Sequence, residues 1–552
     1  MPAEVLLRQV TSRLFTSDEM RLINVQSLGL EVFYGAEQDI PRYAILSHTW
    51  GADELTLAQF TNGDLQVHSH KDGYAKIARC CHLAAAAGLG YAWVDTVCID
   101  KSSSAELTEA INSMFRWYQN AAVCHVWLND LLPDTGDLSR LEDCRWFRRG
   151  WTLQELLAPA IVEFYDRDWT FRGTKQDLQR ELCDITNISE AVLEKPGRMF
   201  GLSVAQRMSW AASRETTRPE DLAYCLLGIF DVNMPLLYGE GERAFLRLQD
   251  EISKETNDLS LFAWRHPDNE QGAVKQPFHG VFAPSPDRFI GGSHILPGWN
   301  PALSPEYMLT NKGIRVEANL TELEDGRVLL LLNVLSWPAR AVVGIWVRAH
   351  GGGVYSRVES DRFGNAPQGG RASAAVRKRI YLLKRISPAY AQRLLTGHHN
   401  AIFLRQGFHR LSMPRLSEFS CEITRVHPED DWVAAQRAIY THGASEFTVF
   451  VWFELRVAGV PCASDGLPTA VLVVCKLEEK KKSFALLLSS DLADKVLQPS
   501  GQFEKSLLSS FQGTRDSIIV MGPGIMRLSV SLEWRLVNEE RVYCVDMAFH
   551  KC

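Results

Sequence analysis

Two residues four positions apart, Trp151 and Glu155, carry the strongest chemical signal in this sequence. They lie in Arg145–Pro159, which reads RWFRRGWTLQELLAP. Residues four apart share one face of a helix, so a helix here places a carboxylate beside an indole. The other side of that helix is mostly apolar and can anchor it in a core, through Leu153, Leu156 and Leu157. This pairing suits a site that stabilises a positive charge developing in a small ligand.

Four short apolar segments alternate with helical patterns around this stretch. They predict strands at Tyr43–Leu46, Tyr91–Val94, Ala122–Leu128 and Ile161–Tyr165. One helix is expected over Tyr74–Ala87, ending at Gly88. A second is expected after a capping box at Ser103 and Glu106, with apolar residues at helical spacing at Leu107, Ile111, Met114, Phe115 and Tyr118. This β-α-β-α-β-α-β order predicts a parallel sheet with helices on both faces.

Polar side chains follow three of the predicted strands. Carboxyl ends of parallel strands meet at one edge of a sheet, which is the usual ligand site of such folds. The helix carrying Glu155 is expected to close over this edge. The alternative is that these residues cap helices and complete turns. We favour that alternative for Asp100, Asn129 and Asp130, and leave both possibilities open for Ser47 and Asp95. The three groups are Ser47/His48, Asp95/Asp100 and Asn129/Asp130.

The pattern changes twice after the predicted sheet. A helical appendage is expected first, with helices at Ser203–Ala212, Pro219–Phe230 and Glu242–Ile252. Pro219 is expected in the first turn of its helix, and Tyr238–Gly241 is expected to form a turn before the last helix. From residue 258 to 552 the pattern is typical of a mainly antiparallel sandwich or barrel without a catalytic motif. Its strands are expected at Gly280–Ala283, Gly313–Ala318, Arg327–Asn333, Ala341–Val347, Glu446–Leu455, Ala470–Leu477, Ser517–Met521 and Met526–Val537.

The composition, and the motifs that are not recognisable, argue against several classes of protein. The 552 residues are 46% hydrophobic and 23% charged, with a net charge of −7, which argues against a nucleic-acid binder. The twelve cysteines form no C-x-x-C pair, so no zinc site is expected and a reduced, cytoplasmic protein is the simplest account. No signal peptide, membrane span or phosphate-binding loop is recognisable. The apolar run Val328–Val347 is interrupted and predicts two strands and a turn.

Four motifs, in this order, resemble the heterokaryon-incompatibility (HET) domain of filamentous fungi. They are YAILSHTWG at Tyr43–Gly51, WVDTVCIDK at Trp93–Lys101, RGWTLQEL at Arg149–Leu156 and DLAYCLLG at Asp221–Gly228. The resemblance covers roughly residues 20–255. Met20–Val25 resembles the usual start of such domains, so residues 1–19 are expected to be an extension and residues 20–257 the HET domain, with its helical part at 203–257. The resemblance implies a role in non-self recognition and regulated cell death, a form of fungal innate immunity.

HET domains are in turn similar to Toll/interleukin-1 receptor (TIR) domains, which implies a TIR/flavodoxin-like sheet. In enzymatically active TIR domains, a tryptophan and a glutamate four apart lie on a helix, and the glutamate is needed to cleave NAD. The resemblance therefore implies that Glu155 is catalytic and that NAD is a substrate, with no cofactor and no metal. Cleavage expels neutral nicotinamide and leaves oxocarbenium character on the ribose, which a carboxylate stabilises. Substrate-binding residues are expected to be Ser47, His48, Trp50, Asp95, Arg145, Arg149 and Trp151.

Each expected substrate contact has a physical reason. Trp50 or Trp151 could stack on a ring of the ligand. Arg149 or Arg145 could meet the diphosphate, because a planar guanidinium suits it. The alternative for Glu155 is a surface glutamate that pairs with Arg149 or Arg148.

Two further readings compete with the NAD-cleaving effector. In one, the HET domain is a non-enzymatic module that signals through self-association. In the other, Cys98 is a nucleophile with His48 as its base, although Cys98 lies in an apolar setting typical of a small buried residue. The expected partners are further copies of the HET domain and an upstream sensor protein, with no nucleic acid and no membrane span. The β-rich half is expected to sense or to restrain.

Overall fold

The chain packs as two units in a computed structural model. The first comprises the described residues within 1–274, 280–347 and 357–384, and the second comprises the others. The structure describes residues 18–35, 37–61, 65–133, 138–266, 278–298, 305–322, 328–351, 353–365 and 376–396. Beyond these it describes residues 401–404, 419–427, 429, 432–433, 438–440, 447–457, 460–461, 470–477, 484–489, 517–521, 525–537 and 540–551.

A seven-stranded mixed sheet organises the N-terminal part of the first unit. Its strand order is β2-β1-β4-β3-β5-β6-β7. The four predicted strands are confirmed as neighbours, and they pair in parallel as β4-β3-β5-β6. The strands are β1 (Asp18–Asn24), β2 (Leu30–Gly35), β3 (Tyr43–His48), β4 (Tyr91–Trp93), β5 (Val123–Trp127), β6 (Val162–Tyr165) and β7 (Phe171–Thr174).

Three strands that were not predicted extend this parallel core, and they pair antiparallel. β1 pairs antiparallel with β2 and with β4, and β7 pairs antiparallel with β6. β1–β2 and β6–β7 are hairpins, which need only a short turn, whereas β1 joins β4 from a distant part of the chain. The four central strands are parallel, as predicted. Every residue of β3 is buried, as expected for a strand covered on both faces.

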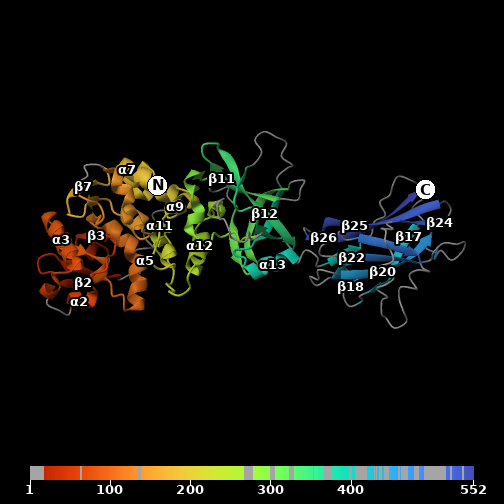
Figure 1. Cartoon of the computed structure of the whole chain (residues 1–552), viewed down its shortest axis with the longest axis horizontal. Helices are drawn as coiled ribbons and strands as arrows, with labels where there is room; N and C mark the ends of the chain where they lie inside the picture. The colour runs from red at the N-terminus through yellow and green to blue at the C-terminus, as the bar shows by residue number, and fades with distance from the viewer. Residues whose placement is uncertain are drawn as a thin grey trace. The chain divides into compact units, whose positions relative to one another are not determined.

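Helices connect the parallel strands. The predicted helix before Gly88 is confirmed as α3, which lies near β3 in Figure 1 and packs against β3 and β4. It ends just before Gly88, whose φ of 72° suits glycine. The helices up to residue 194 are α2 (Leu57–Thr61), α3 (Asp72–Ala86), α4 (Asp95–Cys98), α5 (Ser104–Asn120), α6 (Thr152–Leu157), α7 (Gln179–Thr186) and α8 (Glu190–Glu194).

The predicted capping box at the start of α5 forms only by half. The Ser103 side chain accepts a hydrogen bond from the backbone N–H of Glu106 at 3.3 Å, so Ser103 is the N-cap. The Glu106 carboxylate instead accepts from the backbone N–H of Asp100 at 2.7 Å and pairs with Arg21. Glu106 thus ties the loop after α4 and the strand β1 to the start of α5.

The predicted helical region after residue 203 is present, but its middle helix is divided. The stretch expected at Pro219–Phe230 forms two short helices, and Pro219 precedes the N-cap Glu220 instead of lying in a first turn. A Cβ at Gly228 would lie 2.1 Å from the Cβ of Phe115, so α11 packs closely on α5 only because this residue is glycine. The helices are α9 (Val204–Ser209), α10 (Asp221–Tyr224), α11 (Leu227–Phe230) and α12 (Arg243–Glu255).

Short 3₁₀ turns lie between these elements. One of them, η4 (Arg145–Arg148), comes directly before the segment that carries Glu155. The others are Glu37–Asp39, Leu65–His68, Leu138–Asp143, Pro196–Gly201, Leu259–Phe262, Pro286–Phe289 and Gly292–His294.

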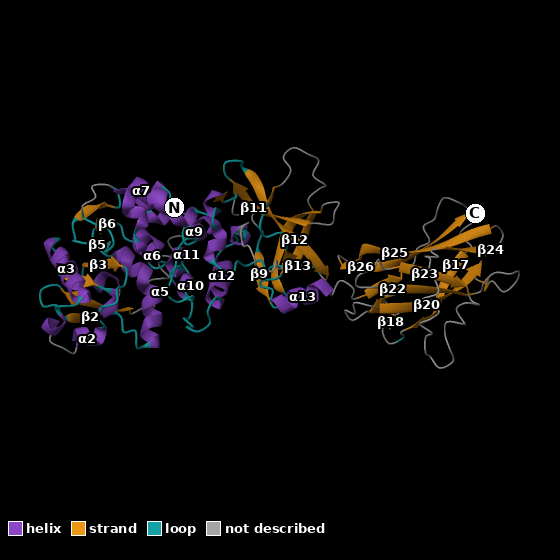
Figure 2. Ribbon diagram, in the orientation of Figure 1, coloured by secondary structure: helices purple, strands orange, loops and turns teal. Residues whose placement is uncertain are grey.

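The chain changes from helix-rich to strand-rich after α12, as Figure 2 shows. The next sheet has the order β14-β12-β13-β15-β10-β11-β8, with β9 paired to β10. The predicted strand at Gly280–Ala283 is wrong, because this segment is irregular even though the Val281 N–H donates to the carbonyl of Leu383. The strands are β8 (Ile295–Leu296), β9 (Tyr307–Thr310), β10 (Gly313–Glu322), β11 (Val328–Ser336), β12 (Ala341–Gly351), β13 (Val354–Arg357), β14 (Gly364–Asn365) and β15 (Val376–Leu382).

The last part contains two further sheets, with the orders β18-β19-β16-β26-β25-β24 and β17-β20-β22-β23, and β21 paired to β20. The four strands predicted here are confirmed as β20, β22, β24 and β25. The elements are α13 (Pro388–Thr396), β16 (Ala401–Leu404), β17 (Phe419–His427), β18 (Trp432–Val433), β19 (Ala438–Tyr440), β20 (Phe447–Val457), β21 (Val460–Pro461), β22 (Ala470–Leu477), β23 (Phe484–Ser489), β24 (Ser517–Met521), β25 (Ile525–Val537) and β26 (Glu540–Lys551). None of the described helices is long and apolar enough to span a bilayer.

Candidate functional site

Glu155 is a buried carboxylate at the carboxyl end of the central strand β3. All six residues of α6 are buried, and only 7% of Glu155 is exposed. The Ser47 hydroxyl, near the end of β3, donates to Oε2 of Glu155 at 2.5 Å, and the Trp146 indole N–H donates to Ser47 Oγ at 2.8 Å. The alternative of a surface glutamate paired with Arg148 or Arg149 is therefore wrong.

Burial also controls the ionisation of this carboxyl group. Desolvation raises the pKa of Glu155 from its ordinary value to about 8. The hydrogen bonds from Ser47 and Tyr118 and the charge of Arg214 oppose this rise in pKa, whereas the charge of Asp95 adds to it. At neutral pH the carboxyl group of the free protein is therefore mostly protonated, and a nearby positive charge would favour its ionised form.

Arg214 is a part of this site that the sequence reading missed. It donates from Nε to the carbonyl of Trp210 at 3.1 Å and from one terminal nitrogen to the carbonyl of Arg149 at 2.8 Å and to Thr152 Oγ1 at 3.0 Å. Burial lowers its pKa to about 10, so the guanidinium stays charged at neutral pH. A buried cation thus lies at the start of α6, and nothing in the local sequence around residue 214 signals it.

A second group of side chains gathers where β3 and β4 end. The Trp50 indole N–H donates to Asp95 Oδ2 at 2.9 Å, and the Lys101 ammonium lies 3.7 Å from the same oxygen. Burial alone would raise the pKa of Asp95, but the charges of Lys101 and Lys76 and the hydrogen bond from Trp50 hold it below the ordinary value. Asp95 is therefore an ionised carboxylate at neutral pH, close enough to Glu155 to raise the pKa of that group.

His48 is buried beside this group and is neutral. Desolvation and the charge of Lys76 lower its pKa to about 3. Its Nε2 lies 3.8 Å from Asp95 Oδ1 and 3.9 Å from Glu54 Oε1, which is too far for a hydrogen bond. Glu54 pairs with Lys76, a buried contact that the sequence reading also missed.

The remaining expected binding residues divide between two places. Arg145 reaches the Trp50 side, where its guanidinium donates to the Trp50 carbonyl at 3.3 Å. Arg149 instead donates to Thr217 Oγ1 at 3.2 Å. Trp151 is the N-cap of α6, and its indole hydrogen-bonds to Asp221, a contact that tends to lower the pKa of Asp221. The structure thus brings Arg145 to the Trp50 group, whereas Arg149 and Trp151 have partners in the segment 217–221.

The three polar residues for which a structural role is favoured have partners within the protein, and the contact of Asp100 is a local turn contact. Asp100 accepts from the N–H and hydroxyl of Ser102, Asp130 accepts from the N–H of Arg145, and Asn129 accepts from the Thr49 hydroxyl at 3.2 Å. The Thr49 contact joins the ends of β3 and β5, as expected for parallel strands.

Cys98 is unsuited to act as a nucleophile. Burial raises the pKa of its thiol to about 12, and its sulfur accepts a hydrogen bond from the Val94 N–H at 3.4 Å. A thiol, unlike a thiolate, is a poor nucleophile. Within the described residues, no group of three or more His, Cys, Asp or Glu side chains is arranged to hold a metal ion.

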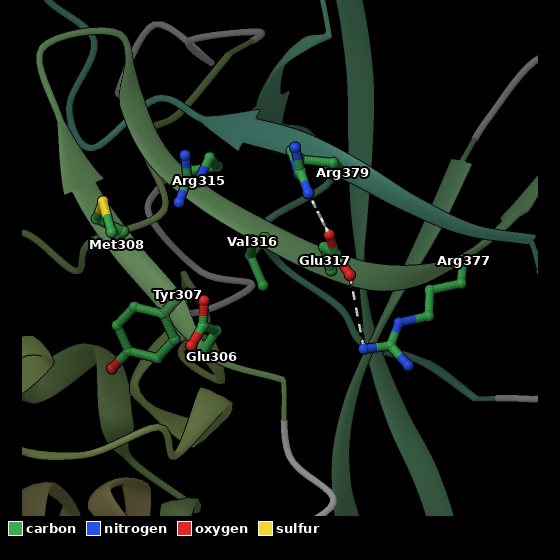
Figure 3. Close-up of a pocket in the computed structure, with 8 residues that line it drawn as sticks. All are labelled: Glu306, Tyr307, Met308, Arg315, Val316, Glu317, Arg377 and Arg379. Atoms are coloured by element: carbon green, nitrogen blue, oxygen red, sulfur yellow. Dashed lines mark hydrogen bonds and ion pairs between the residues drawn. The ribbon is translucent and has the colours of Figure 1, made fainter.

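A separate polar groove of about 260 Å³ lies on β9, β10 and β15 and contains none of the expected site residues (Figure 3). Glu317 on β10 pairs there with Arg379 at 2.8 Å and with Arg377 at 3.7 Å, both from β15. These pairs lower the pKa of Glu317 and link the two strands. Glu317 is thus held in its ionised form, whereas burial of Glu155 at the end of β3 favours the protonated form.

Comparisons with known proteins bear on the first of these sites. The family described as Heterokaryon incompatibility protein (HET) matches residues 43–140. The chain is also 45% identical over 255 residues to the Vegetative incompatibility protein HET-E-1 of Podospora anserina, and the aligned part covers 45% of this chain and 19% of that protein. No solved structure matches the chain. The matched residues include β3, β4 and β5 with their polar strand ends, and the chain therefore contains a heterokaryon-incompatibility (HET) domain.

Proposed function

We propose that this protein acts in fungal non-self recognition and triggers cell death by cleaving NAD at the nicotinamide–ribose bond. The HET domain and the likeness to an incompatibility protein support the first part. The observation that carries the second part is the buried Glu155, held by Ser47 at the end of β3 beside the ionised Asp95. Glu155 is the catalytic carboxylate in this proposal.

The chemistry needs one well-placed negative charge. The bond to nicotinamide breaks heterolytically, the bonding electrons leave with the ring, and the ribose carbon gains positive character until water adds to it. An ionised carboxylate in a water-poor site stabilises that charge more in the transition state than in the ground state. Because nicotinamide leaves as a neutral molecule, no acid has to protonate it.

The raised pKa of Glu155 fits a site that takes a cation. In the free protein the carboxyl group is mostly protonated, which lowers the cost of keeping it buried. The positively charged nicotinamide ring of NAD would shift the group toward its ionised form, because an opposite charge nearby lowers a carboxyl pKa. Substrate binding would thus generate the catalytic carboxylate.

The architecture supports a TIR-like relationship as part of this proposal. The parallel strands follow the order β4-β3-β5-β6, in which the first strand in sequence lies between the second and the third. In doubly wound folds with this order, ligands bind at the carboxyl ends of the strands where the order reverses, here β3 and β5. Ser47 lies at that place, and Trp151 and Glu155 keep the spacing of active TIR domains.

A non-enzymatic signalling module is the second function that we consider. The low exposure of Glu155, 7%, favours this function, because a purely structural glutamate would be buried in the same way. Under either function we propose that the HET domain self-associates, responds to an upstream sensor and works in the cytoplasm. The β-rich half from residue 258, in the division we propose, would restrain it.

Expression in a filamentous fungus separates these two functions. The variants are Glu155→Gln, which keeps the shape but cannot ionise, and Glu194→Gln as a control, because the Glu194 side chain is 51% exposed on α8. If the enzyme proposal holds, the wild type and the control deplete cellular NAD before the cells die, and Glu155→Gln does neither. Cell death with Glu155→Gln at unchanged NAD levels would favour the adaptor.

A further inference from the structure

Lys101 covers one face of Trp50 in the site beside Glu155. The Lys101 ammonium lies 3.7 Å from the centre of the Trp50 ring and 3.7 Å from Asp95 Oδ2. The same carboxylate oxygen accepts the Trp50 indole N–H at 2.9 Å, so the ring and the carboxylate are fixed relative to each other. An indole face and an anionic oxygen together form a place that attracts positive charge.

Two buried polar atoms next to this place lack hydrogen-bond partners. They are His48 Nε2 and Asp95 Oδ1, which lie 3.8 Å apart. Buried polar groups are normally satisfied, and leaving one unpaired is costly. A hydroxyl group placed between them could hydrogen-bond to both, so this observation also indicates a ligand, independently of the contact between Lys101 and Trp50.

We propose that Trp50 and Asp95 form the binding site for a positively charged aromatic ring, and that Lys101 occupies this site as an internal cation until the ligand displaces it. The identity of the ring rests on the proposed function, which makes it the nicotinamide ring of NAD. The adjoining ribose would then place a hydroxyl against His48 and Asp95. Lys101 is a gate in this arrangement, because substrate and lysine compete for one face of Trp50.

The position of Lys101 allows this exchange. It lies in the loop between α4 and α5, and 35% of its side chain is exposed, so the ammonium can move into water at little cost. Because the Lys101 end of this ion pair reaches water, the pair contributes little to stability. Trp50 is itself 49% exposed and is therefore accessible once the lysine leaves. A cationic aromatic ring gains ring stacking in addition to the attraction between charge and indole.

Equilibrium dialysis of the full chain against 1-methylnicotinamide, a small cation, tests this proposal, with neutral nicotinamide as the comparison probe. We expect the cation to bind more tightly than the neutral ring. Lys101→Met should bind the cation about fivefold more tightly than the wild type, because the competing charge is gone. Lys101→Arg keeps a competing cation and should bind like the wild type, and Trp50→Leu should lose the binding. Thermal melting curves establish that each variant is folded.

Two results would overturn the inference. One is equal binding of the charged and neutral probes. The other is weaker binding of the cation by Lys101→Met, which would make Lys101 a ligand-holding residue. These binding measurements require no turnover, so a failure of the proposed NAD-cleaving function can be told apart from either of these two results. If the protein binds the cation as expected but releases no nicotinamide from NAD, the proposed Trp50 site stands and the proposed NAD-cleaving function fails.

Discussion

The ionisation of Glu155 gives a stability prediction that needs no substrate. In the unfolded chain this carboxyl group has its ordinary pKa, and in the folded protein burial raises the pKa to about 8. Between these two values the folded protein binds more protons than the unfolded chain. The free energy of unfolding therefore decreases as pH rises through this window, and the contribution of protonated Glu155 is lost above about pH 8.

The size of the effect follows from the same shift in pKa. Each unit of difference between the folded and unfolded pKa corresponds to about 1.4 kcal/mol. From about pH 5.5 to about pH 7.5, the Glu155 contribution should fall by roughly 2 to 3 kcal/mol. Glu155→Gln lacks this ionisation, keeps an oxygen that can accept the Ser47 hydroxyl, and should gain stability relative to the wild type over this range.

Urea denaturation followed by tryptophan fluorescence measures this difference at the two pH values for both proteins. Other titrating groups are common to the two chains, so they cancel in the difference between wild type and variant. A stability difference that is the same at both pH values would mean that Glu155 is already ionised in the acidic sample. That result would refute the argument that burial keeps this carboxyl group protonated.

Three further substitutions test the packing around the site. Gly228→Ala should destabilise the protein by about 1 to 3 kcal/mol in urea denaturation, because a Cβ has no space on α5, whereas Gly201→Ala should not, since nothing lies near its Cβ position. Lys175→Met leaves two buried carbonyls at the end of α6 without their donor and should lower the free energy of unfolding by about 2 to 4 kcal/mol. Lys195→Met, at an exposed lysine, should cause no loss, and equal melting temperatures for the two variants would contradict this prediction. Ser47→Ala removes a hydrogen bond that lowers the pKa of Glu155, so the increase of kcat/KM for NAD with pH should move to higher pH. A pH profile identical to that of the wild type would count against this contact.

The centre of the fold could be predicted from the sequence because its strands are continuous apolar runs. β3, β4, β5 and β6 are short, apolar and separated by helical patterns, and these features alone give a parallel arrangement. The edges could not be predicted in the same way. β1, β2 and β7 carry mixed polar and apolar residues, and their antiparallel pairing depends on which edge of the sheet is left open.

The candidate site was partly visible in the sequence for a similar reason. Ser47 and Asp95 follow predicted strands, so their presence at one edge of the sheet follows from the topology. The burial of Glu155 does not follow from its own helix, because a glutamate among leucines is normally the exposed residue of an amphipathic pattern. Tertiary packing decides it. Ser47, itself held by Trp146, donates to the carboxyl group, and Arg214 comes from a segment 59 positions further along the chain.

Release of nicotinamide from NAD by the purified full chain tests the central claim most directly. The assay compares wild type, Glu155→Gln and the surface control Glu194→Gln at high protein concentration, at which we expect self-association to relieve the restraint by the β-rich half. Nicotinamide is quantified by chromatography. The account predicts release by the wild type and the control, and a rate at least about a hundredfold lower for Glu155→Gln, as expected when a group that stabilises transition-state charge is lost. Equal rates for wild type and Glu155→Gln, or no release by any of the three proteins, would contradict it.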